Sequence, residues 1–140
     1  MNLQAPGEVA REGIQRVWQG DLALISEDYV DHNLPPGLPP GREGLGALYR
    51  LTLAGFPDFE VSIEQLVAEG DLVAVRLTNT GTNAGSFMGQ PPTNKRATWT
   101  TMAIFRVADG KLVERWGIID ALSLFRQLGV RPPTPPPDPS

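Results

Sequence analysis

Asp120 and His32 are the two side chains in this sequence whose type and position best suit acid–base chemistry. Asp120 comes at the end of an alternating apolar segment. A carboxylate held there against apolar walls has a raised pKa, which suits it to remove a proton beside a carbonyl group. Asp120 also directly precedes a predicted helix, where it would act as the N-cap and accept a backbone amide, a contact that lowers a carboxyl pKa. The residue pattern leaves both roles open.

His32 is the only histidine of the chain, and the sequence holds no cysteine. These counts exclude a two-histidine or thiolate metal site, so no such metal centre is expected. His32 precedes a loop rich in proline and glycine, where it would bond a substrate carbonyl, pair with Asp120 or hold the loop backbone. Asn33 would donate to an oxyanion or, as its place before Leu34 and Pro35 favours, act as a turn residue.

Two predicted strands carry aromatic and hydroxyl side chains that are candidates to line a substrate pocket. With a period of two, Trp99 and Thr101 share one face of the first strand, and Trp116 shares a face with Asp120 on the next. If Asp120 faces a cavity, Trp116 faces it too and can stack on a flat substrate. Ordinary core packing is an equally good interpretation of Trp116.

Four further candidates lie outside these strands. Tyr29 and Tyr49 would offer a hydroxyl to a carbonyl oxygen, although packing between helix and sheet is the more common role of such residues. Phe87 and Met88 lie in a long connection at 83–95 and predict either an apolar lid or a dimer contact. A lid of this kind favours an apolar small molecule as the ligand.

Charge argues against nucleic acid as a partner. The chain has 12 Lys and Arg against 16 Asp and Glu, a formal net charge of −4, and no basic cluster that would bind phosphates. Arg106 and Arg115 are predicted to be solvated or to form salt bridges with Glu114, because the alternation of the strands does not clearly place them on the same face as Asp120. No apolar run reaches the ~18 residues of a membrane span. No signal-peptide pattern is present, so a cytoplasmic protein without membrane association is expected.

The spacing of apolar residues predicts the elements that must position these side chains. A period near 3.6 predicts helices at 8–19, at 21–29 with Asp21 as its cap, and from Arg42 to 56. A period of two predicts strands at 59–64, 72–82, 96–107 and 112–119, followed by a short helix at 121–128. Short turns between the strands predict antiparallel neighbours. This order indicates an α+β domain with its helices on one face of the sheet.

Domain organisation follows from length and proline content. A chain of 140 residues buries roughly two-thirds of its unfolded surface, which allows one core with room for a cavity. Residues 1–130 are therefore expected to form a single domain. The segment 131–140 contains six prolines and is predicted to be an extended, disordered tail.

A series of short runs follows in order along residues 8–130, at 29–33, 41–44, 56–58, 67–76, 80–82, 89–93, 104–106, 109–111, 114–116, 120 and 127–129. Taken at these spacings, the series resembles the SnoaL-like polyketide cyclases. Two positions depart from the pattern of that family. Arg115 stands where many members carry histidine before the tryptophan, and Gly117 stands where many carry an acidic residue after it.

The resemblance implies a cone-shaped α+β barrel, shared with ketosteroid isomerases and nuclear transport factor two. In this fold, a curved antiparallel sheet of four or more strands wraps over three N-terminal helices, and a short C-terminal helix follows. The resemblance also implies a cofactor-free acid–base site, with Asp120 as the acid–base residue and His32 near the cavity, commonly in a homodimer.

The hypothesis from the sequence is an enzyme of cyclase, isomerase or lyase type that closes a ring by aldol-type chemistry on an apolar carbonyl substrate. The fold hosts several activities, so alternatives remain. They are a ketosteroid-isomerase-like enzyme, an epoxide-hydrolase-like enzyme, and a module that only binds an apolar ligand.

Overall fold

The computed structural model of the protein describes residues 5–131. Within this range the chain forms helices α1 (Pro6–Val17), α2 (Gly41–Gly55) and α3 (Ala121–Leu128), and strands β1 (Ile25–Asp31), β2 (Glu60–Glu69), β3 (Leu72–Thr82), β4 (Arg96–Ala108) and β5 (Lys111–Ile119). Apart from Arg131, the proline-rich tail predicted from the sequence lies outside the described residues.

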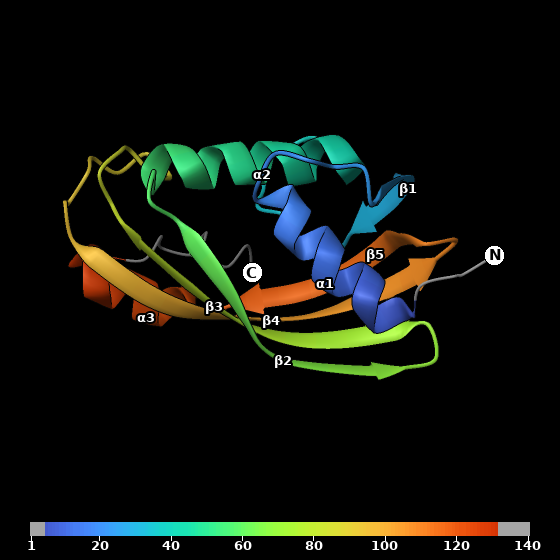
Figure 1. The fold of residues 1–140 in the computed structure, drawn as a ribbon. Helices are drawn as coiled ribbons and strands as arrows, with labels where there is room; N and C mark the ends of the chain where they lie inside the picture. The colour runs from blue at the N-terminus through green and yellow to red at the C-terminus, as the bar shows by residue number, and fades with distance from the viewer. Residues whose placement is uncertain (1–4, 132–140) are drawn as a thin grey trace, which may run out of the picture.

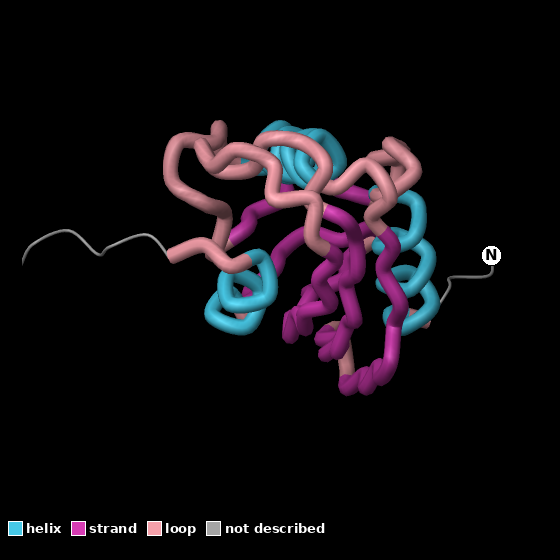
Figure 2. The backbone as a smooth tube through the Cα atoms, turned by 90° about the vertical axis from the view of Figure 1, so that its left-hand side faces the viewer, coloured by secondary structure: helices cyan, strands magenta, loops and turns pink. Residues whose placement is uncertain are grey.

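The strands form one curved sheet in the order β1-β5-β4-β3-β2. β2 to β5 pair antiparallel, whereas β1 pairs parallel with β5 at the edge of the sheet. α1 and α2 lie on one side of the sheet, its inner face, and α3 packs against β4 at one end (Figures 1 and 2). The cone-shaped α+β fold is thus confirmed, as an open and mixed sheet rather than a closed antiparallel barrel.

Alternation along β3 and β4 places one apolar row of each strand on the inner face. These rows pack against α1 in a core cluster that includes Val9, Ile14, Val73, Val75 and Phe105. A second cluster surrounds Phe56, just after the end of α2, and contains Ala97, Trp99, Leu124 and Leu128. The second cluster holds α3 against the inner row of β4.

The helix predicted at 21–29 is wrong, because this segment contains β1. Its buried residues are Ile25 and Tyr29, four positions apart, and that spacing falls on one face in a helix and also in a strand. Asp21 does not cap a helix: its Oδ1 accepts the backbone amide of Ala23 at 2.9 Å, in a local turn. Two helices rather than three therefore precede the main run of strands.

Candidate active site

Asp120 is the N-cap of α3. Its Oδ1 accepts the backbone amide of Ser123 at 3.1 Å, and its own amide donates to the carbonyl oxygen of Thr100 at 2.9 Å. The residue is exposed, so the prediction of a carboxylate buried against apolar walls is wrong. The alternative prediction, that Asp120 caps the helix, is confirmed. The role of Asp120 in proton transfer stays a prediction.

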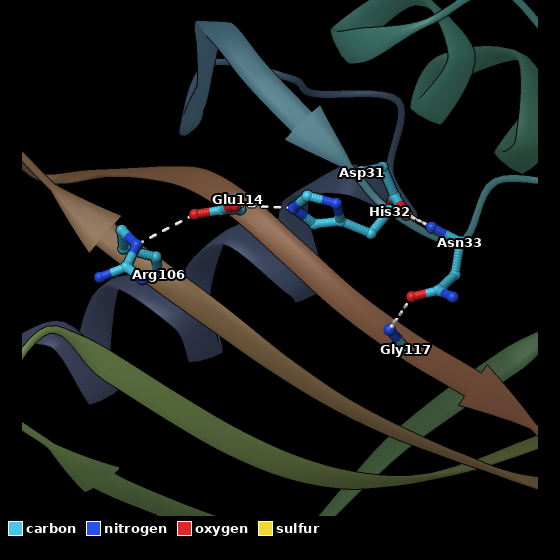
Figure 3. Close-up of polar contacts among 6 residues, drawn as sticks. All are labelled: Asp31, His32, Asn33, Arg106, Glu114 and Gly117. Atoms are coloured by element: carbon cyan, nitrogen blue, oxygen red, sulfur yellow. Dashed lines mark hydrogen bonds and ion pairs between the residues drawn. The ribbon is translucent and has the colours of Figure 1, made fainter.

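His32 lies outside the inner face, in a short segment that continues β1 alongside β5 (Figure 3). Its Nε2 is 2.6 Å from Oε2 of Glu114, and its ring stacks on Trp116 with the ring centres 4.9 Å apart. Its backbone amide donates to the carbonyl oxygen of Arg115 at 2.9 Å. The side-chain partner of His32 is therefore Glu114 and not Asp120, and the residue also helps to hold the loop backbone.

Asn33 continues the same segment. Its Oδ1 accepts the backbone amide of Gly117 at 2.8 Å, and its own amide donates to Oδ1 of Asp31 at 3.0 Å (Figure 3). The side chain thus bonds the edge of β5 as well as forming the predicted turn. These contacts extend the pairing of β1 with β5 beyond the last residue of the strand.

Trp116 lies on the outer face of the sheet, opposite Ile104 of β4 in the strand register. It lines a shallow hollow of about 340 Å³ together with Asn33, Met102, Ile104 and Ile118. The guanidinium of Arg106 lies 5.8 Å from its ring centre and also bonds Glu114 at 3.0 Å. The predicted salt bridge between Arg106 and Glu114 is confirmed.

A second polar cluster lies on the inner face, where β1 meets β5. Nη1 of Arg115 is 3.2 Å from Oδ1 and 3.3 Å from Oδ2 of Asp31, and the hydroxyl of Tyr29 donates to Oδ2 of Asp31 at 2.7 Å. The Asp31 side chain is 0% exposed and that of Arg115 is 13% exposed. The prediction that Arg115 is solvated or paired with Glu114 is therefore wrong.

The register of β4 with β5 explains why Arg115 points inward. Arg115 is opposite Phe105, whose side chain belongs to the inner core, and the next pair along is Gly117 opposite Ala103. Arg115 and Gly117 are thus on the inner face, and Trp116 is on the outer one. Alternation alone separates the two sets but does not say which set faces inward. The inner set is identified by the buried residues of β4, because the hairpin turn at Asp109 fixes which residues of β5 lie opposite them.

Gly117 leaves the space that the Arg115 side chain occupies. A Cβ at position 117 would lie 2.5 Å from Nη2 and 2.6 Å from Cζ of Arg115. Real Cβ atoms essentially never come this close to another atom, so any other residue at 117 would move the guanidinium. Glycine at this position is therefore part of the geometry that places Arg115 beside Asp31.

Tyr49 of α2 belongs to the same inner region. Its ring meets that of Trp18 edge to face at 4.0 Å, and the two residues pack on the first core cluster. Burial raises the pKa of Tyr49 to about 12, with a smaller opposing effect from Arg115. Burial, followed by the nearby charge of Asp31, also raises the pKa of Tyr29. Both phenols therefore remain protonated donors near neutral pH.

The hydroxyl of Tyr49 and two nitrogens of Arg115, Nε and Nη2, make no hydrogen bond with any of residues 5–131. Among residues 5–131, the only fully buried side-chain nitrogen or oxygen without a partner is Nε of Arg42. The unpaired donors of Tyr49 and Arg115 are therefore not sealed from solvent. Each of them is thus at least slightly accessible to solvent, Tyr49 beside the ring of Trp18 and Arg115 beside Asp31.

The remaining predicted site residues have packing roles in the structure. Trp99 is 6% exposed and packs on Phe56 with the ring centres 5.1 Å apart. Thr101 accepts a hydrogen bond from Nδ2 of Asn79 at 2.8 Å, within the inner face. Both side chains point inward as the alternation predicts.

The long connection after β3 is tied to α2. Nδ2 of Asn83 donates to the carbonyl oxygen of Gly55 at 3.3 Å, and Phe87 packs on Phe56 with the ring centres 5.2 Å apart. Met88 is 60% exposed, with a φ of 51°. Phe87 thus closes the second core cluster, and only Met88 is free to contact a ligand or a partner.

Two further searches concern residues 5–131 alone. No group of three or more His, Asp or Glu side chains is placed to hold a metal ion there. None of the helices in that range is long and apolar enough to cross a membrane.

The open curved sheet, with helices on its inner face and a polar cluster among aromatic rings, defines a cone-shaped α+β protein. The family model of the SnoaL-like polyketide cyclases matches residues 12–128, and the chain belongs to this family. The aklanonic acid methyl ester cyclase DnrD of Streptomyces peucetius is 32% identical over 116 residues, which cover 81% of this chain and 77% of that protein.

Two solved structures share this fold. IdmH of Streptomyces antibioticus superposes with a TM-score of 0.78 and is 36% identical, covering 91% of this chain and 100% of its own. AclR of Streptomyces galilaeus has a TM-score of 0.78 at 30% identity, covering 94% of this chain and 100% of its own.

The buried pair predicts a large loss of stability on removal of one charge. Asp31→Asn should lower the free energy of unfolding by about 3–5 kcal/mol, because Arg115 is left without its counter-charge in a poorly solvated site. The matched control is Asp71→Asn, whose side chain is 55% exposed and pairs with Arg106. The control should cost at most about 1 kcal/mol. Urea denaturation compares the two, and equal losses would contradict the assignment of a buried pair.

The outer cluster predicts a pH dependence. Hydrogen bonds from His32, then from Arg106, lower the pKa of Glu114 below its ordinary value of 4.5. A carboxyl with a lowered folded-state pKa contributes stability above its unfolded pKa and loses it as the pH falls through the folded value. The difference in Tm between the wild type and Glu114→Gln should therefore be present at about pH 6 and shrink toward about pH 3. A difference that is constant over this range would show that these bonds do not favour the ionised carboxyl.

Proposed function

We propose that the protein is a cofactor-independent cyclase that closes a ring in an apolar, carbonyl-bearing small molecule by an aldol-type reaction. Membership of the cyclase family supports the reaction class. The observation that carries the proposal is the group of unpaired hydrogen-bond donors, on Arg115 and Tyr49, among the aromatic rings of the inner face. Such donors stabilise the negative oxygen that develops when a proton leaves the carbon beside a carbonyl.

The reaction needs one base and one place for a developing oxygen anion. The base takes a proton from the carbon next to one carbonyl, and the bonding electron pair moves into the enolate. That carbon attacks a second carbonyl carbon of the same molecule, a carbon–carbon bond forms, and the carbonyl electron pair moves to oxygen. The alkoxide then takes the proton back from the base. No atom is lost and no oxidant or reductant takes part.

Asp120 is proposed as this base and acid. One of its oxygens caps α3, and the other accepts no hydrogen bond from the part of the chain that the structure describes. The cap fixes the carboxylate just beyond the end of β5, five residues after Arg115. Such proton transfer typically contributes about 10²- to 10⁴-fold in rate.

A second candidate is an epoxide-opening hydrolase, and the observation that favours it is the buried Asp31–Arg115 pair. A carboxylate beside an arginine can orient a water molecule for attack. Asp31, however, already accepts hydrogen bonds from Arg115, Tyr29 and the amide of Asn33, which leaves it little capacity to bind a water. The arrangement therefore favours a role for Asp31 in positioning Arg115 over a role in activating water.

Asp120→Asn tests the proposed base, because asparagine caps a helix as well as aspartate does. The rate of deuterium exchange at the methyl group of acetylnaphthalene in heavy water should fall at least about a hundredfold. The Tm should change little. Asp28→Asn, an exposed carboxylate of β1, is the control and should retain the rate. Undiminished exchange in Asp120→Asn would remove Asp120 from the mechanism, and no exchange in the wild type would favour a module that only binds its ligand.

We further propose that two copies of the chain pair through the outer face of the sheet. Met102, Ile104 and Ile118 are 50%, 43% and 69% exposed there and adjoin the hollow beside Trp116. Contiguous exposed apolar side chains of this kind mark interaction surfaces. α1 and α2 lie on the opposite face of the sheet (Figure 1), and a second copy presents the same apolar surface to the outer face.

Ile118→Asp should shift sedimentation from dimer toward monomer, because a charge in an apolar interface is desolvated without compensation. Leu51→Asp is the matched control: Leu51 is 52% exposed, but it lies on α2, on the other side of the molecule. The control should sediment like the wild type. A wild type that is monomeric at micromolar concentration, or an equal effect of both variants, would contradict pairing through this face.

A further inference from the structure

We propose that Arg115 and Tyr49 form a binding site for an anionic or enolised oxygen on an apolar ligand, with Asp31 and Gly117 as the residues that position Arg115. The inference deepens the proposed function, on which it rests for the nature of the ligand. It concerns binding and not proton transfer, so it stands or falls on a separate measurement.

Arg115 has donors to offer because only part of its guanidinium is used. Nη1 faces both oxygens of Asp31, while Nε and Nη2 have no hydrogen-bond partner. Nε and Nη2 form the edge of the guanidinium that matches a planar oxygen group, such as a carboxylate or the enolate of a diketone. These donors also touch space that water reaches, since they are absent from the fully buried unpaired atoms of residues 5–131.

The position of Arg115 is fixed from several sides. Asp31 holds Nη1, and Asp31 is itself held by the hydroxyl of Tyr29 and by the amide of Asn33. The guanidinium also lies against the backbone of Gly117, where a Cβ would collide with it. A guanidinium fixed in this way loses little further side-chain entropy when a ligand binds.

Tyr49 supplies a donor from a different element. It projects from α2, its ring is held by the edge-to-face contact with Trp18, and its hydroxyl has no partner. α2 packs against β1, the strand that carries Asp31, so Tyr49 lies on the same face of the sheet as the Asp31–Arg115 pair. A ligand oxygen between Arg115 and Tyr49 would meet a charged donor from the sheet and a neutral donor from the helix.

The surroundings select an apolar ligand body. Trp18 contacts both Tyr49 and Phe59, and the ring centres are 4.0 Å and 4.1 Å apart. Hydrogen bonds in such surroundings are stronger than in water. Arg115 is paired with Asp31, so the cluster carries no net charge before the ligand binds. An oxygen with partial or full negative charge on a flat apolar molecule fits both features.

A purely structural role for Arg115 is the competing explanation. Backbone contacts already join β1 to β5 at this point, including the pair of Asp31 with Arg115 and the amide of His32 bonded to the Arg115 carbonyl. A purely structural link between β1 and β5 needs neither the unpaired Nε and Nη2 of Arg115 nor the hydroxyl of Tyr49. The two explanations differ in whether these donors affect ligand affinity.

The test compares three probes that share one aromatic body: naphthoate, which carries a carboxylate, naphthoylacetone, an enolisable diketone, and methylnaphthalene, which has no oxygen. Binding to the full chain is followed by tryptophan fluorescence and calorimetry. Arg115→Gln should weaken one or both oxygen-bearing probes by roughly tenfold to a hundredfold, the effect of losing a charged hydrogen bond. Methylnaphthalene should change by less than about twofold. Tyr49→Phe should weaken the same probes by about threefold to tenfold.

The two oxygen-bearing probes identify the source of the anion. If the site holds an enolate, the red-shifted absorption of the naphthoylacetone enolate should appear with the wild type and disappear with Arg115→Gln. If it holds a carboxylate, only naphthoate should depend on Arg115. Arg115→Lys keeps the positive charge but lacks the paired N–H donors of a guanidinium. Its affinity for the oxygen-bearing probes should lie between that of the wild type and that of Arg115→Gln.

Further variants keep the test decisive if Arg115→Gln does not fold with Asp31 unpaired. The double variant Asp31→Asn with Arg115→Gln removes both charges together, and Gly117→Ala keeps both charges but displaces the guanidinium. Each should lose the preference for oxygen-bearing probes over methylnaphthalene. Equal affinity of the wild type for all three probes, or unchanged affinities in the Arg115 and Tyr49 variants, would overturn the proposal. The same titrations with Asp28→Asn, an exposed carboxylate of β1, should match the wild type. Deuterium exchange in Asp120→Asn and probe preference in the Arg115 and Tyr49 variants are separate readouts, so failure of the proposed base and failure of this binding site give different results.

Discussion

The contact on which the inner face depends is the ion pair between Asp31 and Arg115. A carboxylate that is 0% exposed and a guanidinium that is 13% exposed have both lost most of their hydration, and their mutual attraction offsets that loss only with good geometry and further hydrogen bonds. Tyr29 and the amide of Asn33 supply those further bonds to Asp31. The pair therefore constrains where β1 lies along β5, and the parallel edge strand, the Pro-rich loop and the start of α2 follow from that placement.

Successive residues at the end of β1 connect the two faces of the sheet. Asp31 points inward to Arg115, and His32 lies on the outside, between Trp116 and Glu114. On β5 the alternation is the same: Glu114 and Trp116 belong to the outer face, Arg115 and Gly117 to the inner one. A shift of β1 along β5 would break the inner ion pair and the outer hydrogen bonds together. The proposed ligand site and the proposed dimer surface therefore share one piece of backbone, and a change at either face acts on the same strand pair.

Much of the fold could be predicted from the sequence, because alternation and helical period are local properties. The helices at α1, α2 and α3 and the strands β2 to β5 lie close to their predicted places. β1 could not be distinguished from a helix, because Ile25 and Tyr29 are four residues apart and the exposed residues between them are polar in either structure. What makes the segment a strand is its pairing with β5, a contact between residues more than eighty positions apart, such as Asp31 with Arg115.

The candidate site was harder to predict for a related reason. Asp120 was equally compatible with a buried base and with a helix cap, and only the course of the chain after β5 distinguishes a carboxylate inside the cone from an exposed one at its end. The sequence predicts Arg115 to be solvated or paired with Glu114, because its place in the alternation was compared with that of Asp120, whose own orientation was open. The inner row is defined instead by Phe105 and Ala103 of β4, through the hairpin register. Alternation along a strand separates its residues into two faces. A neighbouring residue that is known to be buried, such as Phe105, is needed to identify the inner face.

Arg115 and Gly117, the two positions that depart from the family pattern, are explained by one arrangement. The guanidinium lies directly over Gly117, so an acidic residue at 117 would displace it, and a shorter side chain at 115 would leave space where its end now lies. The two residues thus depend on each other, and together they place a permanent positive charge beside Asp31. An arginine does not release a proton near neutral pH, so it binds and stabilises an oxygen anion but does not act as the acid or base. In this chain, proton transfer therefore requires a group other than residue 115, and Asp31, saturated by its three donors, does not supply it.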